Sequence, residues 1–284
     1  MFASLALGIL LPLAAECHLL LQDDPTLYAG LFEGDIAGVH VKNKELVSVY
    51  PWPNATVKYK IGPEINHMTR TSIMKAIKEI QQKTCIRFVS APEGSNKYLS
   101  FRSYKGCWSH IGTIGTAQEI SIGPGCEDTG VILHELMHAL GFWHENSRTD
   151  REDSILINWD NIPQRFQKYF SAYTIPKVSH FQEPYDLDSI THMSTHAYAK
   201  DRFVPTLMAK DERRKIGSRI ELSAGDVRKL KRMYCGLEIP VLESDTLNVE
   251  TSPNDDNGGF SFLNVLALLQ HCICTLFKVC MKLK

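Results

Sequence analysis

The stretch HELMHALGFWH, which runs from His134 to His144, contains three histidines at a spacing that can bind a metal ion. His134 and His138 are four residues apart, so on a helix their imidazoles share one face and can bind the same ion. Gly141 can adopt a positive φ without steric cost, which lets the chain turn back and bring His144 to that ion. Three protein ligands leave one coordination position for water, which is typical of a catalytic zinc site.

Glu135 follows the first of these histidines directly, where its carboxylate can reach water at the open position. Zinc lowers the pKa of a bound water molecule to about 7, and a neighbouring base can then accept its proton. We therefore predict one zinc ion per chain, held by the three histidines, with Glu135 as the general base of a hydrolysis. A lone histidine on an apolar helix is usually an ordinary core residue, but the helix, the glycine and the third histidine together match a longer metalloprotease pattern.

The metal-binding histidines require a helix, and the mostly apolar run Thr129–Leu140 predicts one, with Gly141 ending it. A helix is also predicted over Thr69–Lys83, because isoleucines recur on one face of it. Another helix is predicted to start near Ser223, which can cap it. Short strands are predicted at residues 57–61, 86–89 and 98–101. Strands with one helix between them, followed by helices, favour a mixed α/β lobe and then a less regular lobe.

The composition fits one globular domain with flanking segments. The chain has 284 residues, a formal net charge of -1 and 44% hydrophobic residues, which is enough to form a buried core. A nucleic-acid partner would favour a basic face on the protein. The near-neutral balance of charges therefore predicts no nucleic-acid partner.

Five zones differ in composition along the chain. They are a signal sequence at 1–15, a short segment at 16–42, a globular body at 43–236, a linker at 237–259 and an apolar, cysteine-containing tail at 260–284. The first zone is rich in small apolar residues and ends in Leu13-Ala14-Ala15, which resembles a cleavage site. A buried N-terminal helix is the alternative, but the polar residues that follow favour a secreted, extracellular protein. The linker is assigned from its content of Ser, Asp, Asn, Gly and Pro.

Four of the eight cysteines lie in the body, at Cys85, Cys107, Cys126 and Cys235. An even set in a secreted protein predicts two disulfides, and the residues alone allow three ways of pairing them. None of these cysteines belongs to a CxxC pair, so a cysteine zinc site is not predicted. A glycosylation sequon begins at Asn54, which agrees with secretion.

The tail at 260–284 has no functional interpretation from its sequence. Its apolar residues are interrupted by polar and charged ones, namely Asn264, Gln270, His271 and Lys278. Such groups are costly in the core of a bilayer, so a membrane-spanning helix is not predicted. A surface-bound helix, a partner-binding segment and an unstructured tail stay open, and so does contact of the tail with a membrane.

The metal-binding stretch continues into a longer pattern. Residues His134–Asp150, HELMHALGFWHENSRTD, resemble the signature of the astacin family of metzincin proteases, which includes hatching enzymes. Cys107–Gly112 and Ile157–Ile162 are also similar to that family, and the resemblance extends over about Trp52–Gly236. It implies an α+β fold, namely a two-lobed metzincin-type protease domain with a mixed sheet and the active-site helix in the N-terminal lobe and a less regular C-terminal lobe. It also implies a secreted zinc metalloendopeptidase that acts on protein or peptide substrates.

The resemblance extends to the segment before the body. Phe32-Glu33-Gly34-Asp35 is similar to the inhibitory motif in the family's pro-segment. Residues 16–42 are therefore predicted to be a pro-segment, and the Asp35 carboxylate is predicted to occupy the open zinc position. The chain is then a zymogen, which an activating protease cuts near Lys42 or Lys44.

Two further features are implied by the resemblance. It selects the disulfides Cys85–Cys235 and Cys107–Cys126, each of which typically stabilises a fold by about 2–4 kcal/mol. It also implies that Glu145, which follows the third histidine, pairs with the new N-terminal ammonium after cleavage, since a buried carboxylate needs such a partner. An exposed Glu145 without this role is the alternative.

One segment departs from the family pattern. The sequence Ser-Ile-Thr-His-Met places Thr191 and Met193 where the family has a methionine and a tyrosine. The family's methionine lies under the zinc and its tyrosine donates a hydrogen bond to the oxyanion, which Met193 cannot do. His196 and Tyr198 are candidate replacements. Two functions therefore stay open: an active endopeptidase, favoured by the intact Glu135, and a zinc-bearing, catalytically weakened protein that binds peptides.

Overall fold

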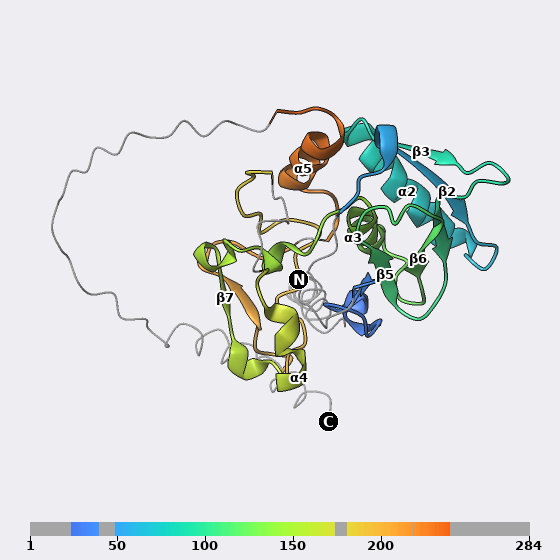
Figure 1. Cartoon of the computed structure of the whole chain (residues 1–284). Coiled ribbons are helices and arrows are strands. Elements are labelled where there is room, and N and C mark those ends of the chain that lie inside the picture. The colour runs from blue at the N-terminus through green and yellow to red at the C-terminus, as the bar shows by residue number, and fades with distance from the viewer. Residues whose placement is uncertain (1–23, 40–48, 174–180, 218, 239–284) are drawn as a thin grey trace, which may run out of the picture. The chain divides into compact units, whose positions relative to one another are not determined.

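The computed structural model describes residues 24–39, 49–173, 181–217 and 219–238 (Figure 1). All of them belong to the first of two compact units into which the chain divides, the one that ends at Pro240. The predicted signal sequence at 1–15, the linker beyond residue 238 and the tail lie outside the described residues, as do the candidate cleavage sites Lys42 and Lys44. Within the described part of the chain, no helix has the length and apolar character that crossing a membrane requires.

A six-stranded mixed sheet forms the N-terminal lobe. Its strands in spatial order are β1 (Ile36–Ala37), β5 (Cys107–His110), β6 (Gln118–Ile122), β4 (Leu99–Arg102), β2 (Thr56–Ile61) and β3 (Arg87–Ser90). β5 runs antiparallel to β6, and every other neighbouring pair is parallel. Because β1 lies in the predicted pro-segment, the pro-segment and the body share one sheet.

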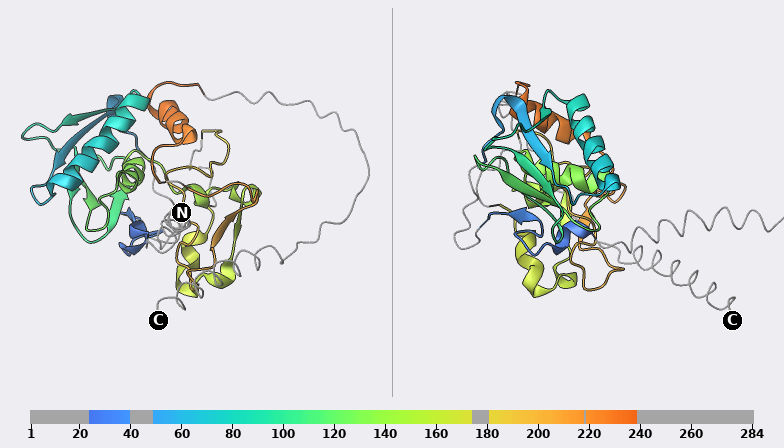
Figure 2. Two further views of the ribbon diagram at one scale, coloured as in Figure 1. Left: turned by 180° about the vertical axis from the view of Figure 1, so that it is seen from behind. Right: turned by 90° about the vertical axis from the view of Figure 1, so that its right-hand side faces the viewer.

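Two helices cover one face of this sheet, α2 (His67–Lys83) and α3 (Thr129–Ala139) (Figure 2). α2 begins two residues before the predicted start, because the Asn66 side chain caps it by accepting a hydrogen bond from the N–H of Thr69 at 2.9 Å. The isoleucine face of α2 is buried in the core, as its periodicity predicts. All residues of α3 from Gly130 onwards are buried, so the predicted active-site helix lies in the centre of the lobe.

The sequence predicts β2, β3 and β4 to within one residue but misses β5 and β6. In β5 and β6, the polar residues Ser109, Gln118 and Ser121 occupy buried positions and interrupt the apolar alternation on which strand prediction depends. The Gln118 side chain is satisfied inside the lobe, where its amide donates to the carbonyl oxygen of Gly112 at 2.8 Å.

The C-terminal lobe is less regular, as predicted. It contains a two-stranded antiparallel sheet, a short helix and several 3-10 turns, with β7 at Ile155–Ile157, β8 at Leu207–Ala209 and α4 at Gln164–Gln167. An apolar cluster holds the lobe together, with Phe170, Met193 and Leu207 fully buried in it. α5 (Ala224–Tyr234) then returns to the N-terminal lobe, where Leu230 joins the larger core.

Two disulfides join Cys85 to Cys235 and Cys107 to Cys126, the pairing that the resemblance implies. The first attaches the end of α5 to the chain just after α2, and the second attaches β5 to the loop before α3. Asn54 is exposed in the turn before β2, where a glycan would be accessible, and its glycosylation stays a prediction.

The N-terminus of α5 has the cap that the sequence predicts at Ser223. Ser223 Oγ accepts a hydrogen bond from the N–H of Asp226 at 2.9 Å, and the Asp226 carboxylate accepts one from the N–H of Ser223 at 3.1 Å. Ser223→Ala should therefore lower the free energy of unfolding by about 0.5–2 kcal/mol, measured by chemical denaturation. The exposed Ser103→Ala is the matched control. Equal stability of the Ser223 variant and the parent would contradict the capping role.

Candidate active site

α3 carries His134 and His138 on one face, and both side chains are fully buried. Just after the helix ends, Gly141 has a φ of 107°. A Cβ atom at Gly141 would lie 2.8 Å from Met233 Cε, so a side chain there would be both strained and crowded. The turn at Gly141 redirects the chain and brings His144 back to the two histidines of the helix.

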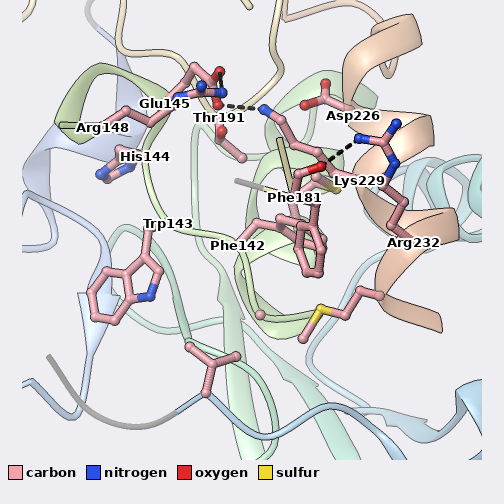
Figure 3. Close-up of a pocket in the computed structure, with 14 residues that line it drawn as sticks. Phe142, Trp143, His144, Glu145, Arg148, Phe181, Thr191, Asp226, Lys229 and Arg232 are labelled. Atoms are coloured by element: carbon pink, nitrogen blue, oxygen red, sulfur yellow. Dashed lines mark hydrogen bonds and ion pairs between the residues drawn. The ribbon is translucent and has the colours of Figure 1, made fainter. Parts of the chain in front are cut away.

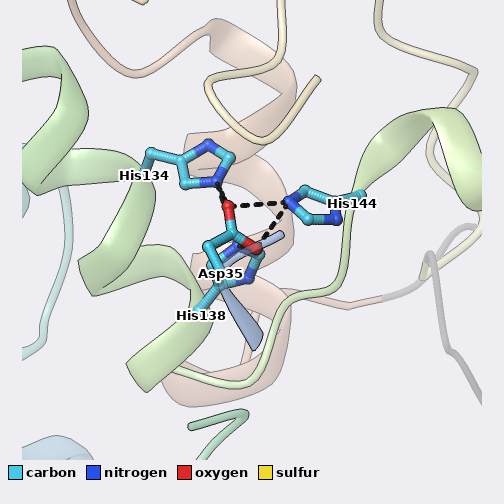
Figure 4. A group of neighbouring side chains, drawn as sticks. All are labelled: Asp35, His134, His138 and His144. Atoms are coloured by element: carbon cyan, nitrogen blue, oxygen red, sulfur yellow. Dashed lines mark hydrogen bonds and ion pairs between the residues drawn. The ribbon is translucent and has the colours of Figure 1, made fainter. Parts of the chain in front are cut away.

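The three histidines meet the Asp35 carboxylate in one cluster (Figure 4). The four candidate ligand atoms all lie within 4.8 Å of one another. Asp35 Oδ2 lies 3.0 Å from His134 Nε2 and 3.3 Å from His144 Nε2. His138 Nε2 lies 3.0 Å from His134 Nε2. The fold thus brings the Asp35 carboxylate to histidines that lie about a hundred residues further along the chain.

Backbone carbonyl groups hold the outer nitrogens of the two helical histidines. His134 Nδ1 lies 2.8 Å from the carbonyl oxygen of Ile190, and His138 Nδ1 lies 2.7 Å from that of Phe142. A carbonyl oxygen can only accept, so each Nδ1 carries the proton and each Nε2 keeps its lone pair. The Nε2 lone pairs of these two histidines face each other, an arrangement that fits a cation bound between them. Asp35 Oδ1 also fits a bound cation, because it is buried without a hydrogen-bond partner in the described part of the chain.

Burial and the neighbouring groups together shift the pKa values in the cluster. Burial alone would raise the pKa of Asp35, but the neighbouring His144, together with the close contacts that its carboxylate makes with His134 and His144, holds this pKa well below its usual range. Burial lowers the pKa of His138 far below its usual value, so this ring is neutral and can bind a metal. Imidazole nitrogens with one carboxylate oxygen are a donor set typical of zinc.

Glu135 is buried beside this cluster, next to His134 on α3. Neither of its carboxylate oxygens has a hydrogen-bond partner among the described residues. Burial, and after it the charge of Asp35, raise the pKa of this carboxyl group well above its usual value. A buried polar group without a partner destabilises a fold, and a strongly raised pKa in such a place is typical of a catalytic acid or base.

The predicted pro-segment reaches the cluster through a tight turn at Gly34. Its φ is 111°, and a Cβ atom there would lie 2.6 Å from the Tyr198 hydroxyl and 2.9 Å from the carbonyl oxygen of Thr26, so only glycine fits. After the turn, β1 pairs with β5, and the N–H of Ser109 donates to the carbonyl oxygen of Asp35 at 3.0 Å. Backbone pairing therefore places the Asp35 side chain at the histidines.

Glu33 is a site residue that the sequence does not single out. Its carboxylate accepts hydrogen bonds from the Tyr173 hydroxyl at 2.7 Å and from Ser147 Oγ at 3.1 Å, and it lies 2.7 Å from His144 Nδ1. Burial alone would lower the pKa of His144, but Asp35 and Glu33 raise it to about 10. In the sequence, the signal that could have found Glu33 is its place in the motif FEGD. Its partners His144 and Tyr173 lie more than a hundred residues further along the chain.

Residues 45–235 match the sequence model of the peptidase family described as Astacin. The chain belongs to the astacin family. The members of this family are zinc metalloendopeptidases, and the family assignment made from the sequence is confirmed.

Curated relatives give the extent of the similarity. Zinc metalloproteinase nas-7 of Caenorhabditis elegans is 36% identical over 200 residues, which cover 70% of this chain and 52% of that protein. Zinc metalloproteinase nas-4 of the same species is 34% identical over 225 residues, which cover 75% of this chain and 71% of that protein. Meprin A subunit alpha of Rattus norvegicus is 34% identical over 206 residues, which cover 72% of this chain and 27% of that protein. This astacin thus spans about half the length of nas-7 and a smaller share of the meprin subunit.

A solved structure gives the fold. High choriolytic enzyme 1, a hatching enzyme zinc-protease of Oryzias latipes, superposes with a TM-score of 0.60 and 31% sequence identity. The superposition covers 66% of this astacin and 94% of that chain. The predicted α+β, two-lobed metzincin-type domain is confirmed.

The two residues that depart from the family pattern, Thr191 and Met193, are both buried. Thr191 is buried, and its Oγ1 lies 3.0 Å from Ser189 Oγ, so its hydroxyl group has a partner. Ser189 Oγ in turn donates to Asp226 Oδ1 at 2.7 Å, which ties the segment to α5. Met193 is fully buried in the apolar cluster of the C-terminal lobe, where its side chain contributes packing and cannot donate a hydrogen bond.

The two candidate replacements for the missing tyrosine lie in different surroundings. His196 Nδ1 lies 2.9 Å from Thr195 Oγ1, within its own turn. The Tyr198 hydroxyl donates to the carbonyl oxygen of Leu27 at 3.2 Å, so it directly contacts the segment predicted to be the pro-segment.

Glu145 lines a cavity of about 330 Å³ beside the site (Figure 3). Its side chain is 4% exposed, so the alternative of an exposed glutamate is wrong. Oε1 accepts a hydrogen bond from Arg148 Nη1 at 2.9 Å, and Oε2 accepts one from Lys229 Nζ at 2.5 Å. Val49, near the predicted start of the mature protease, lines the same cavity. Pairing of Glu145 with a new N-terminus stays a prediction, and in this structure Lys229 provides the ammonium group.

Proposed function

We propose that this chain is a secreted zymogen whose protease domain, residues 43–236, hydrolyses peptide bonds in protein or peptide substrates with one bound zinc ion. One observation carries the proposal. The Asp35 carboxylate of the pro-segment, residues 16–42, lies among the nitrogens of three buried histidines. A carboxylate there blocks the position that water needs. An activating protease would cut between the pro-segment and the body, and the two disulfides agree with an extracellular location.

Zinc held by His134, His138 and His144 would supply Lewis acidity and activate a water molecule for attack on the peptide carbonyl. Glu135 accepts a proton from the attacking water and delivers it to the leaving amine as the C–N bond breaks, so the products are one acid and one amine. Burial raises the pKa of this carboxyl group. A rise in that direction favours a group that first accepts and then donates a proton near neutral pH. The Asp35 carboxylate must leave before substrate can enter.

A zinc-bearing protein that binds peptides without turning them over is the second candidate, because Met193 cannot donate a hydrogen bond to an oxyanion. Glu135 favours the enzyme. A protein that only binds has no use for a buried carboxyl group that lacks a hydrogen-bond partner among the described residues and destabilises the fold.

The test is turnover by the processed protein. The chain is cut within residues 40–48, the pro-segment is separated, and cleavage of a denatured protein substrate is followed. We expect turnover that a chelator removes and added zinc restores. A zinc-loaded, processed protein that binds peptides and cleaves none would favour the second candidate.

Metal content provides a separate prediction. The purified protease domain should hold about one zinc per chain, as expected of a site with three histidines. His138→Ala should reduce the zinc content to below about a tenth of that value, because two protein nitrogens bind zinc far more weakly than three. Metal analysis measures both proteins, with the exposed His67→Ala as the control that should keep its zinc. Full zinc occupancy in the His138 variant would refute the assignment of the ligands.

A further inference from the structure

The hydroxyl group of Tyr198 faces the part of the pro-segment that carries Asp35. It donates a hydrogen bond to the carbonyl oxygen of Leu27 at 3.2 Å. It also lies so close to Gly34 that a Cβ atom there would be 2.6 Å away from it. Gly34 is bonded directly to Asp35, so this phenol lies next to the residue that blocks the histidine cluster.

The ring of Tyr198 is held in place by other aromatic side chains. Its centroid lies 4.5 Å from that of Phe166, 5.5 Å from that of Tyr169 and 6.1 Å from that of Phe170. The backbone of Tyr198 has a φ of 54°, a left-handed conformation that is unusual for an aromatic residue. Such strain is found most often at functional sites, where surrounding structure maintains it. The phenol is thus presented to the site by a rigid support.

Peptide hydrolysis needs a donor as well as a base, because negative charge develops on the carbonyl oxygen in the transition state. Three histidine nitrogens face the metal position, Glu135 can only accept when ionised, and the Thr191 hydroxyl is paired with Ser189 Oγ. Among the described residues, the acceptor of the Tyr198 hydroxyl belongs to the pro-segment. Once the pro-segment leaves, this hydroxyl is free to bind a substrate.

A second phenol, that of Tyr173, also binds the pro-segment, but it lies on the wrong side of the cluster. It donates to Glu33, the residue at Nδ1 of His144. The other nitrogen of that ring, Nε2, faces Asp35 and the metal position. Tyr173 therefore lies beyond the ring, whereas Tyr198 contacts the residue bonded to Asp35.

We infer that Tyr198 is a further catalytic residue, whose hydroxyl donates a hydrogen bond to the oxyanion of the substrate after the pro-segment has left. This inference rests on the proposed peptidase function and adds the donor that Met193 cannot provide. The hydroxyl keeps its proton for this role, because an ordinary phenol is protonated near neutral pH. In the uncut chain, burial and after it the charge of Asp35 raise the pKa of Tyr198 further.

Tyr198→Phe in the processed protease tests the inference. The variant keeps the ring in its aromatic cluster and removes only the hydroxyl group. We expect kcat to fall by about 10²- to 10³-fold with KM and zinc content unchanged, which is the usual effect of removing one oxyanion donor. The matched control is Tyr169→Phe, which alters another phenol of the same cluster and should leave kcat unchanged.

A binding measurement separates this inference from the proposed function. A phosphinic peptide has a tetrahedral centre with charged oxygens and imitates the transition state, whereas an intact peptide does not. The affinity of Tyr198→Phe for the phosphinic peptide should fall by about the same factor as kcat, and its affinity for an intact peptide should not change. Loss of phosphinic-peptide affinity in Tyr198→Phe supports the inference even if the parent protein turns over no substrate. Absence of turnover by the parent would refute only the proposed function. Parent-like kcat and phosphinic-peptide affinity in Tyr198→Phe would overturn the inference and leave Tyr198 as an anchor for the pro-segment.

Discussion

Glu135→Gln in the processed protease will lower kcat by about 10²- to 10⁴-fold, the usual contribution of a general base. The Glu135 carboxyl group is buried next to a candidate metal ligand, and no described residue forms a hydrogen bond to it. Burial, and after it the charge of Asp35, raise the pKa of this carboxyl group, which favours its neutral form in the uncut fold, so a neutral amide of the same shape should be tolerated. The expected loss is therefore one of proton transfer, with zinc content and thermal stability close to those of the parent.

The measurement is kcat on a peptide substrate, with zinc analysis of the same sample. Glu119→Gln is the matched control, because Glu119 is an exposed carboxylate whose contact with the Tyr104 hydroxyl lies outside the site. Activity at the level of the parent in Glu135→Gln would mean that another group accepts the proton. The same activity in every variant, including His138→Ala, would identify a contaminating protease.

Asp35→Ala in the uncut chain will raise peptidase activity by about 10²- to 10³-fold. The Asp35 carboxylate is buried and lies within hydrogen-bonding distance of His134 and His144. Removing one partner of a buried ionic contact typically costs about 3–5 kcal/mol, and each 1.4 kcal/mol is about tenfold in an equilibrium constant. The contacts of Glu33 and the pairing of β1 with β5 remain, so some inhibition should persist.

A control within the same segment makes this result specific. Asp24 pairs with Arg219 and Thr26, so Asp24→Asn weakens the same segment but leaves the Asp35 carboxylate at the histidines, and it should raise activity in the uncut chain less than Asp35→Ala does. Turnover of a fluorogenic peptide by both uncut variants is compared with that of the processed parent. An Asp35→Ala chain that stays as inactive as the uncut parent would show that Glu33 and the backbone of the pro-segment cause the latency.

Much of the site could be predicted from the sequence because its parts are local. The spacing of His134 and His138 and the glycine that follows them define a helix, a turn and a metal site within one short stretch. Asp35 was predictable only through its resemblance to a family motif. The roles of Glu33 and Lys229 could not be predicted, because each depends on a partner 84 or more residues away, and nothing local marks such a pair.

Prediction of the fold from the sequence is limited to local patterns in the same way. The helices and the apolar strands follow from periodic burial, which each segment displays by itself. β5 and β6 escape prediction because Ser109 and Gln118 are polar residues at buried positions, which breaks the apolar alternation that marks a strand. The place of Tyr198 depends on three aromatic neighbours and a turn with positive φ, none of which a pattern of single residues reveals.

The predicted pro-segment and the histidines that it is proposed to block belong to one chain, joined through residues 40–48. A short tether of this kind gives an inhibitor an effective concentration on the order of millimolar. Glu145 already has Lys229 as a partner, so cleavage need not create an ion pair to complete the site. Cutting the tether turns an intramolecular contact into a bimolecular one, and the blocked fraction then depends on the total protein concentration. Freshly cut protease should therefore stay inhibited by its own released peptide in concentrated solution and become active on dilution alone.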